Sequence, residues 1–136
     1  MFLGSYALKL DDKGRLILPA KFRDDLAEGI VMTKGQEHCL YVFKRPDFVA
    51  QAAALDSLPL TDKPAREYNR LFFANAHPDA PDKQGRITVP TELRTYAGLT
   101  KDCVVLGANT RLEIWDAAAW ATYQAAKEPA YADQAG

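Results

Sequence analysis

One stretch of the chain occurs twice, and this duplication constrains the fold more than any other feature of the sequence. Residues 11–23 reappear as residues 82–94. The two copies are identical at five of these thirteen positions, where ordinary residue usage predicts about one. At three more positions one apolar residue replaces another, in the pairs Leu16/Ile87, Leu18/Val89 and Phe22/Leu93. The chain therefore contains an internal duplication.

The duplication extends beyond this stretch, because residues 35–43 align with residues 107–115 after one inserted residue. A chain of 136 residues can bury one ordinary core, or two small cores that share a surface. Modules this small often need a partner, so we expect an oligomer. We expect one domain at residues 5–47 and a second at residues 76–119, with a helical connector at residues 48–75 between them. Residues 120–136 are expected to form a C-terminal helix and a disordered tail.

The apolar periodicity predicts the same order of elements in both copies, which indicates an α+β fold of two ββαββα-type repeats. In the first copy we expect a strand at residues 4–10, a turn at 11–14, a return strand at 15–18 and a helix at 19–29. A second hairpin follows at residues 30–34 and 38–43, and then a helix that opens at Pro46 and runs over residues 46–55. In the second copy we expect a turn at residues 82–85, a strand at 86–89 and a helix at 90–97. A hairpin follows at residues 102–106 and 111–115, and the last helix at 117–127.

A connecting helix over residues 62–76 belongs to neither copy. Thr61 is its candidate N-cap, and its apolar stripe consists of Tyr68, Leu71 and Phe72.

The overall charge gives no sign of a nucleic-acid binder, because the formal net charge is -1 and the isoelectric point about 6.1. Any site for a polyanion must come from local placement of Lys and Arg. Cys39 and Cys103 lie in expected strands without the paired spacing of a zinc site, so we predict two buried free thiols. We expect no signal peptide and no membrane span.

An Asp and two Arg recur in both copies. Asp11 and Arg15 flank a tight turn, where the carboxylate can hold the guanidinium in one orientation, and Arg23 follows on the helix. An Arg held in this way can present its N–H groups to a phosphate, or to O6 and N7 of guanine. Lys13 and Lys21 extend the positive patch.

The second copy repeats the pattern with Asp82, Arg86 and Arg94, but it is less basic. Gln84 and Glu92 replace the two lysines, and Lys83 compensates in part. Each Asp and Arg pair could also be a surface ion pair that only ties a turn together, and such pairs contribute little. Two copies with the same spacing favour a functional site over this alternative.

Catalysis has little support in the sequence. His38 and His77 fall at unrelated positions, and the chain has no G-x-S-x-G elbow, P-loop or H-E-x-x-H motif. We therefore expect no enzyme, no cofactor, no metal and no small-molecule substrate.

The pattern Asp-x-x-Gly-Arg-x-x-x-Pro-x-x-apolar-Arg resembles the hallmark of the SpoVT/AbrB-type DNA-binding domains. Two such domains in a chain that begins Met1-Phe2-Leu3-Gly4 are similar to the MraZ family. The resemblance implies that the two repeats pair into an AbrB-like swapped-hairpin β-barrel and that several protomers close into a ring. It further implies a cytoplasmic, nucleoid-associated transcriptional regulator, mainly a repressor of the division and cell-wall gene cluster, that meets double-stranded DNA in the major groove at repeated promoter sites.

The family motif carries over to six residues, which are Asp11, Arg15, Arg23, Asp82, Arg86 and Arg94. We expect Arg15 and Arg86 to read bases or grip phosphates, and the helix arginines to hold the DNA backbone. The two Asp orient the arginines. Charge and placement alone add Lys13, Lys21 and Lys83.

An antitoxin-like or scaffold protein that acts mainly through a protein partner is the alternative. Many AbrB-type antitoxins carry one such domain followed by a long disordered toxin-binding tail, whereas only a few residues follow Pro129 here, which argues against this alternative.

Overall fold

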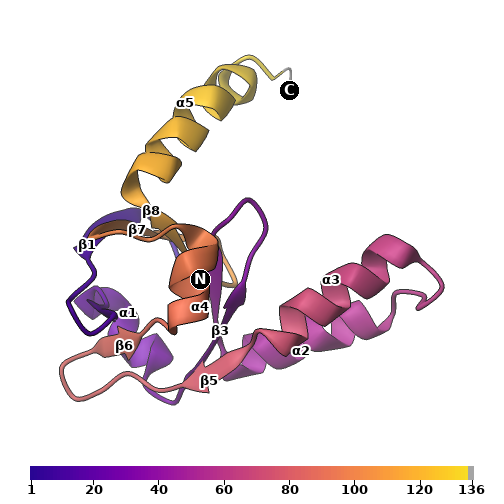
Figure 1. Ribbon diagram of the computed structural model, residues 1–136, viewed down its shortest axis with the longest axis horizontal. Coiled ribbons are helices and arrows are strands. Elements are labelled where there is room, and N and C mark those ends of the chain that lie inside the picture. The colour runs from indigo at the N-terminus through magenta and orange to yellow at the C-terminus, as the bar shows by residue number, and fades with distance from the viewer. Residues whose placement is uncertain (135–136) are drawn as a thin grey trace.

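The computed structural model describes residues 1–134, and this part of the chain forms a six-stranded antiparallel sheet, a two-stranded ribbon and five helices (Figure 1). The order of the strands in the sheet is β1-β7-β8-β4-β3-β5, and the ribbon is β2-β6. The elements are β1 (Ser5–Lys9), β2 (Arg15–Ile17), α1 (Ala20–Leu26), β3 (Ile30–Lys34), β4 (Leu40–Lys44), α2 (Arg45–Asp56), α3 (Lys63–Ala74), β5 (His77–Asp79), β6 (Arg86–Thr88), α4 (Thr91–Ala97), β7 (Asp102–Gly107), β8 (Leu112–Asp116) and α5 (Ala117–Ala132). The α+β class is confirmed, and among the described residues the sheet does not close into a barrel.

The two copies are joined by strand pairing. Strand β1 of the first copy pairs with β7 of the second, β4 pairs with β8, and β2 pairs with β6. The predicted hairpin between residues 4–10 and 15–18 is therefore wrong in its pairing, although both strands exist. The reason is burial: β2 and β6 each carry one fully buried residue, Leu16 or Ile87, and pairing the two strands places both side chains over the common core.

Strand β5 was not predicted, because its sequence His77-Pro78-Asp79 reads as the end of the preceding helix. It pairs with β3 at the edge of the sheet. Proline cannot donate to a strand ladder and is tolerated at such an edge. By the repeat, β5 is the second copy's counterpart of β1.

The core lies on both faces of the sheet. On one face the ribbon, α1 and α4 cover side chains such as Val42 and Ile114, with Phe22 and Leu93 from the helices. This core draws on both copies, so the chain has one shared core here rather than two small ones. On the other face α2, α3 and α5 cover a second, aromatic cluster that contains Cys39, Tyr41, Phe43, Phe72 and Trp115.

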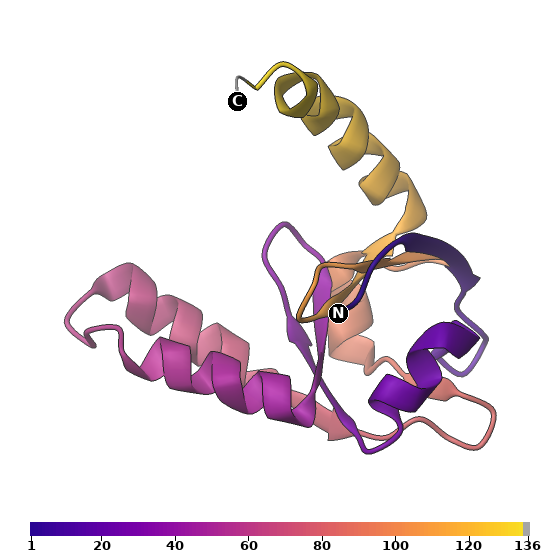
Figure 2. The same ribbon diagram turned by 180° about the vertical axis from the view of Figure 1, so that it is seen from behind.

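Helices α2 and α3 form a hairpin that projects from the sheet (Figures 1 and 2). Two predictions about α3 are wrong. Its N-cap is Asp62 instead of Thr61, because the Asp62 carboxylate accepts a hydrogen bond from the backbone N–H of Ala65 at 3.0 Å. Leu71 is 60% exposed, whereas Phe72 is buried and packs on the aromatic rings of the first copy.

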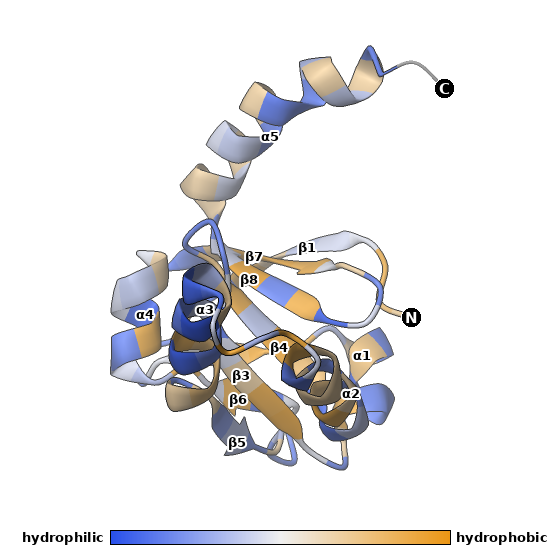
Figure 3. Ribbon diagram, turned by 90° about the vertical axis from the view of Figure 1, so that its right-hand side faces the viewer, coloured by the Kyte–Doolittle hydropathy of each residue, from blue (hydrophilic) through white to orange (hydrophobic). Residues whose placement is uncertain are grey.

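Helix α5 also projects from the sheet, in a direction different from that of the α2–α3 hairpin (Figures 1 and 2). It runs to Ala132, beyond its predicted end at residue 127, so residues 130–132 of the tail predicted to follow Pro129 are helical, and residues 135–136 lie outside the described residues. Figure 3 shows hydrophobic residues gathered on the strands, whereas α5 carries mixed colours along its length. None of the helices in residues 1–134 is long and apolar enough to span a membrane.

Candidate nucleic-acid interface

The turn at residues 11–14 fixes Arg15 through one carboxylate. Oδ1 of Asp11 accepts the backbone N–H groups of Lys13 at 2.9 Å and Arg15 at 2.8 Å, and Oδ2 accepts Nε of Arg15 at 2.8 Å. Gly14 completes the turn at φ 77°, a backbone conformation that favours glycine. Asp11 thus holds both the turn and the guanidinium.

The second copy repeats this arrangement almost bond for bond. Oδ1 of Asp82 accepts the backbone N–H groups of Gln84 and Arg86, both at 2.9 Å, and Oδ2 accepts Nε of Arg86 at 2.7 Å. Gly85 has φ 78°. The predicted orienting role of the two Asp residues therefore has the expected geometry.

These hydrogen bonds favour the ionised carboxylates. The backbone N–H of Arg15 is the largest cause that lowers the pKa of Asp11 below its ordinary value, followed by the side-chain bond from the same arginine. The pKa of Asp82 is lowered in the same way by Arg86. Each Arg therefore faces a charged partner at neutral pH.

Both arginines lie on one face of the ribbon. In the β2–β6 register Arg15 is opposite Thr88, Leu16 is opposite Ile87, and Ile17 is opposite Arg86. Opposed residues share a face and neighbours along a strand alternate, so the outer face consists of Arg15, Ile17, Arg86 and Thr88. The side chains of the two arginines are 26% and 27% exposed, while the inner Leu16 and Ile87 are buried. The ribbon thus presents two oriented guanidinium groups related by an approximate two-fold axis.

The helix arginines contact the turn of the opposite copy, which the sequence did not predict. Nε of Arg23 donates to the carbonyl of Leu18 at 3.1 Å, and the side chain lies over Gly85 so closely that a Cβ there would meet Nε. Arg94 covers Gly14 in the same way. The main chains are joined as well, since the N–H of Leu18 donates to the carbonyl of Gly85 at 2.9 Å. Neither turn is therefore built by one copy alone.

The predicted lysines do not share one environment. Lys13 and Lys83 are exposed in the two turns beside the ribbon. Nζ of Lys21 instead donates to the hydroxyl of Tyr6 at 2.6 Å and lies over the rings of Tyr6 and Phe22. The structure brings the turn lysines together with the Asp and Arg set and directs Lys21 towards β1.

Ile17 and Thr88 complete the outer face, and neither was selected from the sequence. The signal was available, because each lies two residues after an arginine of the motif on a strand, and residues at that spacing share a face.

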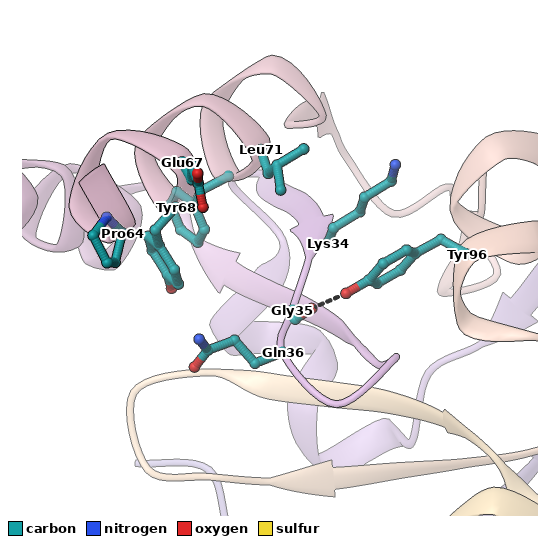
Figure 4. Close-up of a pocket in the computed structure, with 9 residues that line it drawn as sticks. Lys34, Gly35, Gln36, Pro64, Glu67, Tyr68, Leu71 and Tyr96 are labelled. Atoms are coloured by element: carbon teal, nitrogen blue, oxygen red, sulfur yellow. Dashed lines mark hydrogen bonds between the residues drawn. The ribbon is translucent and has the colours of Figure 1, made fainter.

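Two cavities lie away from the ribbon. One, of about 320 Å³, lies between α3, the loop after β3 and α4, where the Tyr96 hydroxyl donates to the carbonyl of Gly35 (Figure 4). The other, of about 360 Å³, lies beside α5 and is lined by Arg111 and Trp120 among others. Neither cavity is lined by a residue of the ribbon or its turns.

His77 lies beside a carboxylate, and both cysteines are buried. Nε2 of His77 lies 3.3 Å from Oε1 of Glu92. Cys39 and Cys103 are buried and free, as predicted. Burial raises the pKa of both thiols, that of Cys103 to about 11. Within residues 1–134, no three His, Cys, Asp or Glu side chains are grouped so as to hold a metal ion.

Fold and site together define a class of protein: a duplicated α+β chain in which both copies build one ribbon that carries two oriented arginines. The family model described as "MraZ protein, putative antitoxin-like" matches residues 1–71 and again residues 72–135. The chain belongs to the MraZ family, as the doubled motif predicted.

Curated relatives support this membership over nearly the whole chain. A protein of Salinispora tropica is 60% identical over 133 residues, which are 98% of this chain and 94% of the relative. Proteins of Frankia alni and Thermobifida fusca are 59% and 56% identical, over 98% and 99% of this chain and 93% and 94% of their own lengths. All three are named transcriptional regulator MraZ. The chain is thus a member of a family of transcriptional regulators, which is not a class of enzyme.

Proposed function

We propose that this protein is a sequence-specific DNA-binding regulator of transcription whose β2–β6 ribbon enters the major groove. The observation that carries the proposal is the doubled Asp and Arg turn, which places Arg15 and Arg86 on the outer face of one ribbon. The shared name of the relatives supports the regulatory part.

The ribbon has suitable dimensions and chemistry. The major groove of B-form DNA admits a two-stranded β-ribbon, and an arginine can donate two hydrogen bonds to O6 and N7 of guanine. Because Nε of each arginine is held by Asp11 or Asp82, the terminal Nη groups remain to face a base or a phosphate. Lys13 and Lys83 flank the ribbon where the phosphates of the groove would lie. Arg23 and Arg94 support the turns, because they lie over Gly85 and Gly14. From these positions beside the ribbon they can add contacts to the DNA backbone.

Several copies acting together would explain how a chain of net charge -1 binds a polyanion. A ring of protomers presents one ribbon from each, so weak single contacts add up through a high effective concentration. Two projecting parts supply apolar surface for such an assembly. Leu58 and Leu60 are 45% and 73% exposed at the tip of the α2–α3 hairpin, and Trp120 of α5 is only partly buried.

The resemblance to the MraZ family supplies the domain arrangement, the DNA targets and the direction of regulation in this proposal. Cross-copy pairing of β1 with β7 and β2 with β6 supports the AbrB-like swapped-hairpin arrangement of two paired domains. The targets are repeated promoter sites of the division and cell-wall gene cluster, repression is the main outcome, and the protein acts on the nucleoid.

The test is binding of the purified protein to DNA from upstream of its own gene, against scrambled DNA, across a salt series. We expect selective binding whose affinity falls steeply with salt. Arg15→Ala and Arg86→Ala should each lower affinity for the selected DNA about 5- to 150-fold, the equivalent of about 1–3 kcal/mol for a bidentate contact. Arg70→Ala, an exposed arginine of α3, is the matched control and should bind like the unchanged protein. Unchanged affinity in both ribbon variants would refute the proposal.

A protein partner is the second candidate, favoured by the antitoxin-like wording of the family description and by the aromatic cavity beside α5. Under this alternative the protein would co-purify with a stoichiometric partner, and Arg15→Ala would leave its function unchanged.

A further inference from the structure

We propose that Ile17 and Thr88 are specificity-determining residues that make the ribbon read two different half-sites and so give it a direction along the DNA. This assignment depends on the proposed function, because it concerns which bases the ribbon prefers once it lies in the groove.

The two residues occupy equivalent places in the duplicated ribbon. Arg15 and Arg86 are equivalent in the repeat, as are Ile17 and Thr88, and the register places the approximate two-fold axis between Leu16 and Ile87. All four outer positions therefore form two related pairs. The arginine pair is identical and holds its guanidinium groups by the same bonds. Only the second pair breaks the symmetry of the outer face.

Each member of that pair lies beside an arginine of the other copy. Ile17 is directly opposite Arg86, and Thr88 is directly opposite Arg15. Side chains at directly opposed positions of an antiparallel pair have Cβ atoms about 4.5–5.5 Å apart. A base next to the one that Arg86 contacts therefore meets Ile17, and a base next to the one that Arg15 contacts meets Thr88.

The two side chains offer different chemistry to those bases. Ile17 is 52% exposed and apolar, so it can contact the C5-methyl group of thymine but cannot satisfy a base-edge donor or acceptor. Thr88 offers a methyl group and a hydroxyl that both donates and accepts hydrogen bonds, so it tolerates more than one base. The half-site read by Arg86 and Ile17 is thus expected to require thymine beside guanine, and the half-site read by Arg15 and Thr88 is less restricted.

The test exchanges the two residues and maps the preferred DNA by selection from a randomised site. Ile17→Thr places threonine at both positions 17 and 88, and Thr88→Ile places isoleucine at both. The double exchange restores one isoleucine and one threonine, with their positions reversed. We expect the unchanged protein to select an asymmetric core site, each single variant to select a symmetric one, and the double variant to select the original site reversed. Both residues are β-branched and exposed, so the strands should tolerate the exchanges.

A second measurement removes a single methyl group from the DNA. Deoxyuridine in place of the thymine beside the Arg86 guanine should weaken binding of the unchanged protein about three- to fivefold, as expected for one lost methyl contact. The same replacement should have little effect on the Ile17→Thr variant.

The outcomes separate the two proposals. If the unchanged protein binds selectively and Ile17→Thr selects the same site, the specificity assignment is overturned while the proposed function stands. If the unchanged protein selects no sequence and Arg15→Ala changes nothing, both are overturned.

Discussion

Gly14 and Gly85 show how single residues determine the geometry of the ribbon. Each has a positive φ, and each lies under an arginine of the other copy, Arg94 or Arg23. An L-residue in this conformation costs roughly 1–2 kcal/mol, and a Cβ at either position would also displace the guanidinium above it.

We therefore expect Gly14→Ala and Gly85→Ala to lower the free energy of unfolding by about 1–2 kcal/mol and to weaken DNA binding as well. Gly98→Ala is the matched control, because Gly98 has φ 60° but nothing within 4 Å of its missing Cβ. It should lose similar stability in urea unfolding and keep its affinity for DNA. Equal loss of binding in the Gly98 variant would contradict a specific role for the covered turns.

The carboxylates of Asp11 and Asp82 lead to a prediction about pH. Their pKa is lowered in the folded protein, chiefly by the backbone N–H of Arg15 or Arg86, so their contribution to stability is present above the ordinary value of 3.8. It is lost only as the pH falls below 3.8 and through the lowered pKa. An NMR titration of the side-chain carboxyl carbons should show both groups more than half ionised at pH 3.8. Midpoints at or above that value would contradict the bonding described.

At the scale of elements, Phe72 is the buried ring of α3, and it packs the helix against Phe43 of β4 and Phe48 of α2. Phe72 is 2% exposed and stacks on Phe48 with ring centroids 5.6 Å apart, while its neighbour Leu71 is 60% exposed. We expect Phe72→Ala to cost about 3–5 kcal/mol of unfolding free energy and Leu71→Ala less than about 0.5 kcal/mol. Urea unfolding of the two variants gives the comparison. Similar losses would mean that α3 does not pack as described.

The sequence was sufficient for elements whose signals are local. The turns at residues 11–14 and 82–85 follow from Asp and Gly, and Phe22 and Leu26 give the buried face of α1. Pairing was not predictable in the same way, because β2 has three residues and only its partner β6 completes a buried face. The contact of Arg23 with Gly85 was missed for the same reason, since no spacing in the chain reports which copy's turn lies beneath a helix.

At the scale of the whole molecule, the shared core makes the two copies one cooperative unit. Each copy contains one cysteine, and burial raises the pKa of both thiols, so neither should react with a thiol reagent at pH 8 in the folded protein. We expect Cys39 and Cys103 to become reactive at the same urea concentration, together with the change in tryptophan fluorescence. Labelling of one thiol at clearly lower urea would show that the copies unfold independently.

The mutual cover of the two turns has an evolutionary consequence. After a gene duplication the halves of a protein are usually free to diverge, because each half keeps its own interior. Here a side chain added at Gly14 would clash with Arg94 in the other half, and one added at Gly85 would clash with Arg23. The halves are therefore obliged to evolve as one inherited unit at these positions, whereas the outward positions 17 and 88 can drift apart and acquire new targets.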